Sequence, residues 1–348
     1  MEHSFFLGAN TASGFRSLYS GFCRGEGDYL CIVKGGPGTG KSGFMRALGR
    51  ACASHGYDVE YVRCSGDPGS LDGVYIPALR LGYVDGTAPH VAEPVVFGVD
   101  SDYVNLGQFC STPLSPADAA RAAQLSAEYK EKYTRAYALL AAGAQIERAL
   151  EPPPPDEKTA ERARQTLRAL VARLAPENGE TGALSQRFGG ALSCEGPLRD
   201  ESALELCKLI YCCEDGCGLA SVALAAARDD ALARGQHVVE YLSPLDGVST
   251  EAVLLPGLSA AFVRAAPALG NVKRIALDRL CGSMDEIKER RRALRAARRE
   301  RTRCVEAACG VLGEAKALHD ALEAVYRPYM DFPSLDAFTA KEIARIFA

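Results

Sequence analysis

Residues 35–42 carry the most specific chemical signal in the chain. They read Gly-Gly-Pro-Gly-Thr-Gly-Lys-Ser and fit the phosphate-binding pattern G-x-x-x-x-G-K-[ST], the P-loop. Glycine lets the backbone adopt left-handed angles and turn its N–H groups toward phosphate oxygens. Lys41 is expected to reach the β- and γ-phosphates, and the Ser42 hydroxyl to ligate Mg²⁺. The predicted phosphate-binding residues are Gly35, Gly36, Pro37, Gly38, Thr39, Gly40, Lys41, Ser42 and Gly43.

The sequence on either side of this loop agrees with the motif. Residues 29–33 form an apolar run with the length of a buried strand. After the loop, the apolar residues Phe44, Met45 and Leu48 have helical spacing. The predicted order is therefore strand, glycine-rich loop and helix, with the N-terminus of the helix directed at an anion.

Reaction chemistry needs a carboxylate near Mg²⁺ and a group that positions the nucleophile. Asp85 is the best carboxylate, because it ends a mainly apolar strand and precedes Gly86-Thr87; we expect it to hold a Mg²⁺-bound water, or else only to form a turn. Asp67 and Asp72 follow the preceding strand, and one of them either orients a water or second substrate or forms a turn. His90 is expected to polarise a water or sense the γ-phosphate, with a plain surface loop as the alternative.

Two weaker predictions concern residues farther along the chain. Asn10 and Thr11 are expected to face the nucleotide, since the second half of the chain has Leu192 and Ser193 in their place. Arg264 or Arg274 would reach the same nucleotide from the second half of the chain.

The sequence of the elements that hold these residues occurs in two similar copies. Phe6-Leu7-Gly8-Ala9 recurs as Phe188-Gly189-Gly190-Ala191, and Leu71-Asp72-Gly73-Val74 recurs as Leu245-Asp246-Gly247-Val248, at an offset of roughly 180 residues. In the second copy the loop reads Asp215-Gly216-Cys217-Gly218-Leu219-Ala220-Ser221. A leucine and an alanine stand where Gly40 and Lys41 stand in the first copy, so we expect this loop to bind nucleotide weakly or not at all.

The predicted fold class is α/β, with duplicated P-loop NTPase-like parallel sheets and a helical hairpin appended to each. The first domain is expected at residues 1–175, with its hairpin at 116–175 interrupted by Pro152 to Pro155. The glycine-rich and polar residues 176–185 are the predicted linker. The second domain is expected at 186–348, and its residues 283–326 are expected to include a long helix that packs in a hairpin or a coiled coil.

Composition narrows the functional class. The chain has 348 residues, a net charge of −4 and no apolar run near the ~18 residues of a membrane helix. Met1-Glu2-His3-Ser4 lacks the basic region of a signal peptide, so we expect a cytoplasmic protein without membrane contact. A basic stretch at 288–303 indicates either a contact for nucleic acid or protein, or the solvated face of a long helix.

Several of these motifs together resemble an uncharacterised group of bacterial tandem P-loop ATPases of the kind found in Firmicutes, whose second P-loop is degenerate. The resemblance covers nearly the whole chain and implies an ATP-binding P-loop fold, but it supplies no substrate. It rests on Gly8-Ala9-Asn10-Thr11, Gly35 to Ser42, Cys64-Ser65-Gly66-Asp67, Ser70-Leu71-Asp72-Gly73, Ile76-Pro77, Asp85 to His90 and Asn105-Leu106-Gly107.

The expected function is Mg²⁺-dependent binding and hydrolysis of ATP at the first loop, with the second copy as a structural or regulatory partner. The guanine-specificity motif Asn-Lys-x-Asp and the ABC-type Leu-Ser-Gly-Gly-Gln sequence do not occur in the chain. Two alternatives stay open. One is a small-molecule or nucleotide kinase, and the other is a non-catalytic ATP-dependent switch or scaffold that binds a protein or nucleic acid through its helical hairpins.

Overall fold

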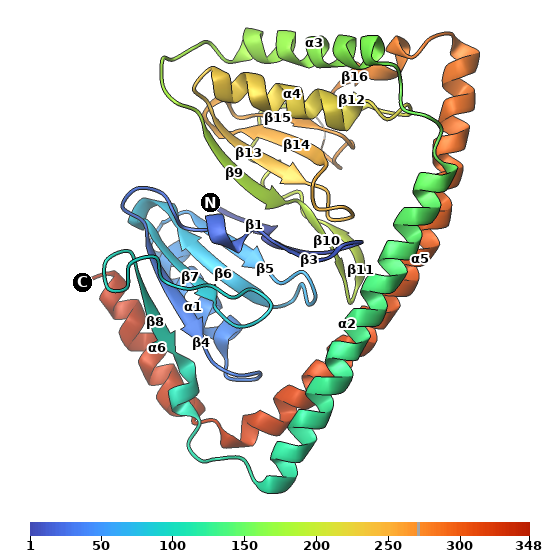
Figure 1. Cartoon of the computed structure of the whole chain (residues 1–348). Helices are drawn as coiled ribbons and strands as arrows, with labels where there is room; N and C mark the ends of the chain where they lie inside the picture. Colours follow the sequence, from blue (N-terminus) through green and yellow to red (C-terminus); the bar gives the residue numbers. More distant parts are fainter. Residues whose placement is uncertain (270–271) are drawn as a thin grey trace.

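One large sheet forms the centre of the molecule in a computed structural model that describes residues 1–269 and 272–348 (Figure 1). Within these residues the sheet has twelve strands. The first half of the chain supplies β1 (Glu2–Phe6), β5 (Val59–Arg63), β6 (Leu71–Ile76), β7 (Leu81–Asp85), β4 (Tyr29–Lys34) and β8 (Ser101–Asn105), in that spatial order. The second half supplies β9 (Ala183–Phe188), β13 (His237–Leu242), β14 (Thr250–Leu255), β15 (Ala260–Val263), β12 (Leu209–Glu214) and β16 (Val272–Ala276).

The two halves repeat one order of strands outward from the centre, where β1 and β9 meet antiparallel through Phe6 and Phe188. Two short hairpins lie beside this junction, β2 (Gly8–Thr11) with β3 (Gly14–Ser17) and β10 (Gly190–Ser193) with β11 (Gly196–Arg199). The α/β class is therefore confirmed, but the two separate sheets of the prediction are one continuous sheet.

The prediction of parallel sheets is also wrong, because the sheet is mixed. Strand β6 runs antiparallel to both β5 and β7, and β14 runs antiparallel to both β13 and β15. The link from β6 to β7 is one 3₁₀ turn, Pro77–Leu79, followed by Arg80 at φ +50°. A parallel neighbour needs a crossover of a dozen or more residues, so this short link imposes an antiparallel pair.

The two longest helices pair with each other along one side of the molecule (Figure 1). They are α2 (Pro116–Leu150) and α5 (Met284–Tyr326). Their contacts run in opposite directions: Lys132 pairs with Glu314, and Glu147 pairs with Arg301. The alanine- and leucine-rich faces around Ala136, Leu140, Ala308 and Leu312 are buried between them.

The predicted hairpins therefore do not form. Helix α3 (Glu157–Leu174) follows the proline run and packs on α4 (Ala220–Ala233) of the second half, where Leu167 and Val171 enter a core with Ala223 and Leu224. Helix α6 (Phe332–Ile346) instead covers α1 (Lys41–Ser54) of the first half, with the Phe338 ring stacked 6.0 Å from that of Phe44. Each half thus receives one helix from the C-terminal end of the other's sequence.

Two further observations complete the fold. Strand β9 begins at Ala183, inside the segment predicted as the linker 176–185. No helix in residues 1–269 and 272–348 is both long and apolar enough to traverse a bilayer.

Candidate functional site

A cavity of about 610 Å³ lies between the glycine-rich loop and the α2/α5 helix pair. All nine residues 35–43 line it, together with Asp67, Asp72, Asp85 and His90. Strand β4 leads into the loop, and β7, which ends at Asp85, is its direct neighbour in the sheet. The opposite wall comes from Tyr129 and Tyr133 of α2 and from residues 312–332 of the C-terminal region.

The loop has the backbone geometry that its glycines allow. Gly38 and Gly40 have φ angles of +71° and +84°, and Gly40 immediately precedes α1. The backbone N–H groups of Gly38, Thr39 and Gly40 donate to no acceptor in the described part of the chain. Lys41 Nζ donates to the carbonyl oxygens of Gly35 (2.9 Å) and Gly36 (3.0 Å), so its ammonium group lies back over the loop. The result is a concave cluster of free donors beside a cation, a good anion site.

Asp85 lies at the edge of this cluster. Its Oδ2 atom is 3.6 Å from Lys41 Nζ, and its Oδ1 atom accepts hydrogen bonds from the N–H (2.8 Å) and hydroxyl (2.6 Å) of Thr87. Ser42 Oγ accepts a hydrogen bond from Leu71 N–H at 2.9 Å, which fixes the hydroxyl at the first turn of α1. A carboxylate and a hydroxyl are hard oxygen ligands of the kind that Mg²⁺ prefers.

Asp72 and His90 form a buried pair in the same cavity. His90 Nε2 lies 3.6 Å from Asp72 Oδ1, and the Tyr19 hydroxyl donates to Asp72 Oδ2 at 2.7 Å. Burial raises the pKa of the Asp72 carboxyl, while nearby His90 and the Tyr19 hydrogen bond act in the opposite direction. Only 8% of His90 is exposed, and its Nδ1 atom has no partner among the described residues. His90 is therefore a buried, oriented side chain rather than a surface loop residue.

Asp67 has the turn geometry that the sequence allowed for it. Its carboxylate accepts hydrogen bonds from Gly69 N–H (3.3 Å) and the Ser70 hydroxyl (3.0 Å). It also lies 3.5 Å from Lys316 Nζ of α5, so it links the loop after β5 to the helix pair.

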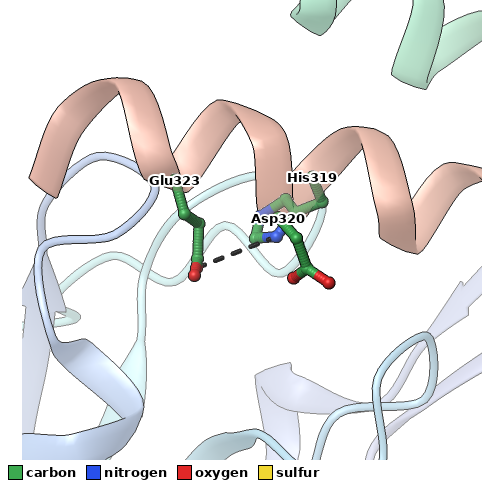
Figure 2. Close-up of side chains that lie close together, drawn as sticks. All are labelled: His319, Asp320 and Glu323. Carbon is green, nitrogen blue, oxygen red and sulfur yellow. Dashed lines mark ion pairs between the residues drawn. The ribbon is translucent and has the colours of Figure 1, made fainter.

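Helix α5 brings side chains to the cavity that sequence reasoning missed. His319 and Glu323 line the cavity and lie one helical turn apart, with 3.8 Å between Nδ1 and Oε1 (Figure 2). Asp320 completes a group whose ligand atoms all lie within 4.8 Å of one another, but its Oδ1 atom is already bonded to Lys316 at 2.5 Å. Arg327 also lines the cavity. The sequence shows that these residues have helical spacing, but the residues around them do not indicate that this helix faces the loop.

The loop and α5 are in direct contact. A Cβ atom added to Gly38 would lie 3.0 Å from the carbonyl oxygen of Glu323 and 3.2 Å from its Cα atom. A Cβ atom on Gly40 would lie 2.8 Å from Leu335 of α6. The glycines therefore permit close approach to the C-terminal helices as well as turning the chain.

The structure contradicts the two weaker predictions. The Asn10 side chain is buried at the junction of the halves, where it donates to Leu192 O (2.9 Å) and accepts from the Tyr137 hydroxyl (3.0 Å). Thr11 donates to Gly14 O within its own hairpin. These residues are buried by contact with the second half, and neither lines the cavity around the loop.

The two arginines expected at the first loop also lie elsewhere. Arg264 is next to Asp215, with 3.9 Å between Nε and Oδ2, and Arg274 pairs with Glu214 at 2.8 Å. Both pairs are within the second half, because β12, β15 and β16 lie at the far end of the sheet from the first loop.

The corresponding loop of the second half is filled by its own carboxylates. Leu219 N–H donates to Asp215 Oδ1 and Gly216 N–H donates to Asp278 Oδ1, both at 2.7 Å. Gly218 keeps a positive φ of +84°, like its counterparts in the first loop. Two of the amide donors that an anion would use are thus already bonded.

The basic stretch 288–303 forms part of α5, and several of its cations have acidic partners. Arg291 pairs with Asp278, Arg301 with Glu147 and Arg303 with Glu300. This pattern is typical of a solvated helix laced with ion pairs.

No family model matches the chain, and no curated protein or solved structure matches it. The motifs and the geometry of the cavity are therefore the evidence for function.

Proposed function

We propose that the first half of this chain is a P-loop NTPase unit that binds ATP with Mg²⁺ and hydrolyses it. The observation that carries the proposal is the loop of residues 35–42, which joins a buried strand to a helix and places Lys41 3.6 Å from Asp85. Free backbone N–H groups, a lysine and a strand-end aspartate are the parts that recur in enzymes of this class. The volume of the cavity, about 610 Å³, is within the range of small-molecule sites.

Each residue has a role that follows from its position. Lys41 would exchange its two carbonyl partners for phosphate oxygens, which are stronger acceptors because they are charged. Ser42 and Asp85 would hold Mg²⁺, directly or through water, and the ion would neutralise charge on the phosphates. The N–H groups of the loop and Lys41 would bind the phosphates, and the oxygens of Ser42 and Asp85 would bind Mg²⁺, so different atoms hold the two parts of the ligand.

His90 is the candidate for positioning the attacking water. Asp72 lies against one ring nitrogen and the other has no partner, an arrangement that orients an imidazole toward a reactant. Packing of the Phe15 and Tyr19 rings, with centroids 5.6 Å and 4.8 Å from that of His90, restricts its movement. Asp67 is held in a turn and pairs with Lys316, so it would connect the loop after β5 to the helix pair rather than take part in the reaction.

The second half is proposed to be a copy of the same unit that has lost the ability to bind a nucleotide. Its strand order repeats that of the first half, but Ala220 replaces the lysine and the carboxylates of Asp215 and Asp278 occupy the loop amides. A phosphate placed on this loop would meet two negative charges and no lysine.

The test compares wild type with Lys41→Ala and Asp85→Asn, using calorimetry for ATP binding and a phosphate-release assay. We expect one ATP per chain, loss of binding in Lys41→Ala, and retained binding without turnover in Asp85→Asn. Lys132→Ala is the matched control, because Lys132 is on α2, pairs with Glu314 and does not line the cavity. Undiminished ATP binding by Lys41→Ala would refute the assignment.

A nucleotide-dependent switch is the second candidate, and the contact between Gly38 and the Glu323 backbone favours it. ATP on the loop would then bias the position of the α2/α5 pair and change affinity for a protein or nucleic-acid partner. Equal partner affinity with ATP and ADP would exclude this candidate. A kinase predicts ADP release that requires an acceptor, which the same phosphate assay separates from hydrolysis.

A further inference from the structure

A second cavity, of about 450 Å³, lies between the loop of the second half and the α2/α5 pair. Its walls come from the start of α4 at Ser221, the segment 243–249 after β13, and the other end of the α2/α5 pair. Strand β12 holds the place of β4 in the repeated strand order, so this cavity occupies the position of the first one in the other half. The two cavities contact the same helix pair at opposite ends.

Arginine is the most frequent residue type in the lining of this second cavity. Five arginines converge there from three elements: Arg148, Arg264, Arg290, Arg298 and Arg301. The acidic residues that face the same space are Glu147, Glu151 and Asp246. The cationic side chains therefore outnumber the acidic ones.

The acidic residues are mostly engaged elsewhere. Glu147 receives two hydrogen bonds from Arg301 Nη1, at 2.6 Å and 2.7 Å. Asp246 accepts hydrogen bonds from the N–H groups of Val248 and Ser249, both at 2.9 Å. Arg290 is held by carbonyl oxygens of Cys217 and Pro153, which leave its charge uncompensated.

Two of the five arginines, Arg148 and Arg298, have no side-chain hydrogen bond or ion pair to another residue in the described ranges. Arg148 is exposed to solvent, whereas Arg298 is half-buried. Burial lowers the pKa of the Arg298 guanidinium, and the neighbouring positive charge of Arg264 acts in the same direction, while the carboxylates of Asp215 and Glu147 act in the opposite one. Arg264 has only a distant carboxylate, that of Asp215 at 3.9 Å. A desolvated cation without an acceptor costs free energy unless an anion binds next to it.

We propose that the second cavity binds a small phosphate-bearing molecule, held by Arg298 and Arg264 in place of a P-loop lysine. Guanidinium groups bind phosphate oxygens in a bidentate fashion, and several converging arginines match a dianion better than a single carboxylate. The hydroxyl of Ser221 lines the same space and adds a donor. Since two of the loop amides are already bonded to carboxylates, side chains would make the main contacts, which distinguishes this site from the first.

The experiment uses inorganic pyrophosphate as the probe, without Mg²⁺, in full-length chain carrying Lys41→Ala. That substitution weakens any binding at the first loop. Arg298→Gln and Arg264→Gln are tested in this background by calorimetry and by thermal unfolding. The matched control is Arg299→Gln, because Arg299 is next in sequence, highly exposed and paired with Glu300.

We expect one pyrophosphate per chain, bound about tenfold more weakly or worse after Arg298→Gln or Arg264→Gln, which is the scale of one lost charge-assisted hydrogen bond. Arg299→Gln should bind like its parent. Without pyrophosphate, Arg298→Gln should unfold at the parent temperature or above it, because it removes an uncompensated cation. No binding in the Lys41→Ala background, or equal affinities in Arg298→Gln and Arg299→Gln, would overturn the proposal.

The result is independent of the proposed ATPase site. If the ATPase proposal is wrong, Lys41→Ala will bind ATP as well as wild type does. If the second-cavity proposal is wrong, Arg298→Gln will leave the affinity for pyrophosphate unchanged.

Discussion

Replacing Gly38 by alanine is expected to weaken the fold and ATP binding together, because the new methyl group would press on α5. Two costs add. Gly38 has a φ of +71°, and holding an alanine in the left-handed region costs about 1–2 kcal/mol. The Cβ atom would also lie 3.0 Å from Glu323 O and 3.2 Å from Glu323 Cα, and overpacking of this kind costs about 1–3 kcal/mol. The free energy of unfolding should therefore fall by about 2–5 kcal/mol.

Two matched glycines separate these costs. Gly218 has a φ of +84°, but no atom of the described residues lies within 4 Å of an added Cβ, so Gly218→Ala should show the backbone cost alone. Gly36 has no positive φ and, in the same part of the chain, no neighbour within 4 Å, so Gly36→Ala should leave stability nearly unchanged. Urea unfolding at equilibrium measures all three variants, and calorimetry with ATP follows.

The difference between Gly38→Ala and Gly218→Ala is the decisive quantity. It should be about 1–3 kcal/mol, because only Gly38 meets the backbone of a 43-residue helix that cannot easily yield. Equal losses in the two variants would refute the reasoning, since the loop would then not be packed against α5.

Two further predictions concern the cavity. Burial raises the pKa of the Asp72 carboxyl above its ordinary value of 3.8, so the folded state binds the carboxyl proton more tightly than the unfolded chain does. The contribution of Asp72 to the free energy of unfolding therefore falls as the pH rises from 3.8 through the raised pKa. Asp72→Asn should therefore show a flatter pH dependence of urea unfolding above pH 3.8 than wild type does, and an unchanged slope would contradict the burial. Arg327 lines the cavity and is paired with no carboxylate in the described chain, so Arg327→Ala should slow phosphate release by about tenfold or more, while Arg121→Ala on α2 should not. Equal rates in these two variants would remove Arg327 from the reaction.

Local sequence predicted the parts of the site that depend on neighbouring residues. The strand before the loop, the loop and the helix after it are 26 consecutive residues, Tyr29 to Ser54, and each follows from its own composition. The place of Asp85 was also predicted, because an apolar strand ending in aspartate needs no distant partner to be recognised. The position of Asp72 against His90 was not predicted, since it depends on how the turn after β7 folds back over β6.

The pairing of the long helices required information that is distant in sequence, whereas the direction of β6 depended on one short link. A strand pattern has the same alternation whether its neighbour is parallel or antiparallel, so only the short Pro77–Leu79 link indicated the direction. The apolar faces of α2 and α3 are equally suited to a hairpin, and the choice of α5 and α4 as partners depends on the assembled sheet. Surface patterning shows that a helix face is buried, not what buries it.

The exchange of helices has a consequence for how the site is built. The loop of the first half is closed by Glu323 of α5 and Leu335 of α6, both of which lie near the C-terminal end of the second half. Conversely, the core beneath α4 contains Leu167 and Val171, which precede the second half. A boundary at residues 176–185 therefore divides the sequence into two similar parts, but each part is incomplete as a packed unit. The geometry of the first cavity therefore depends on the second half being folded, whatever the second half itself binds.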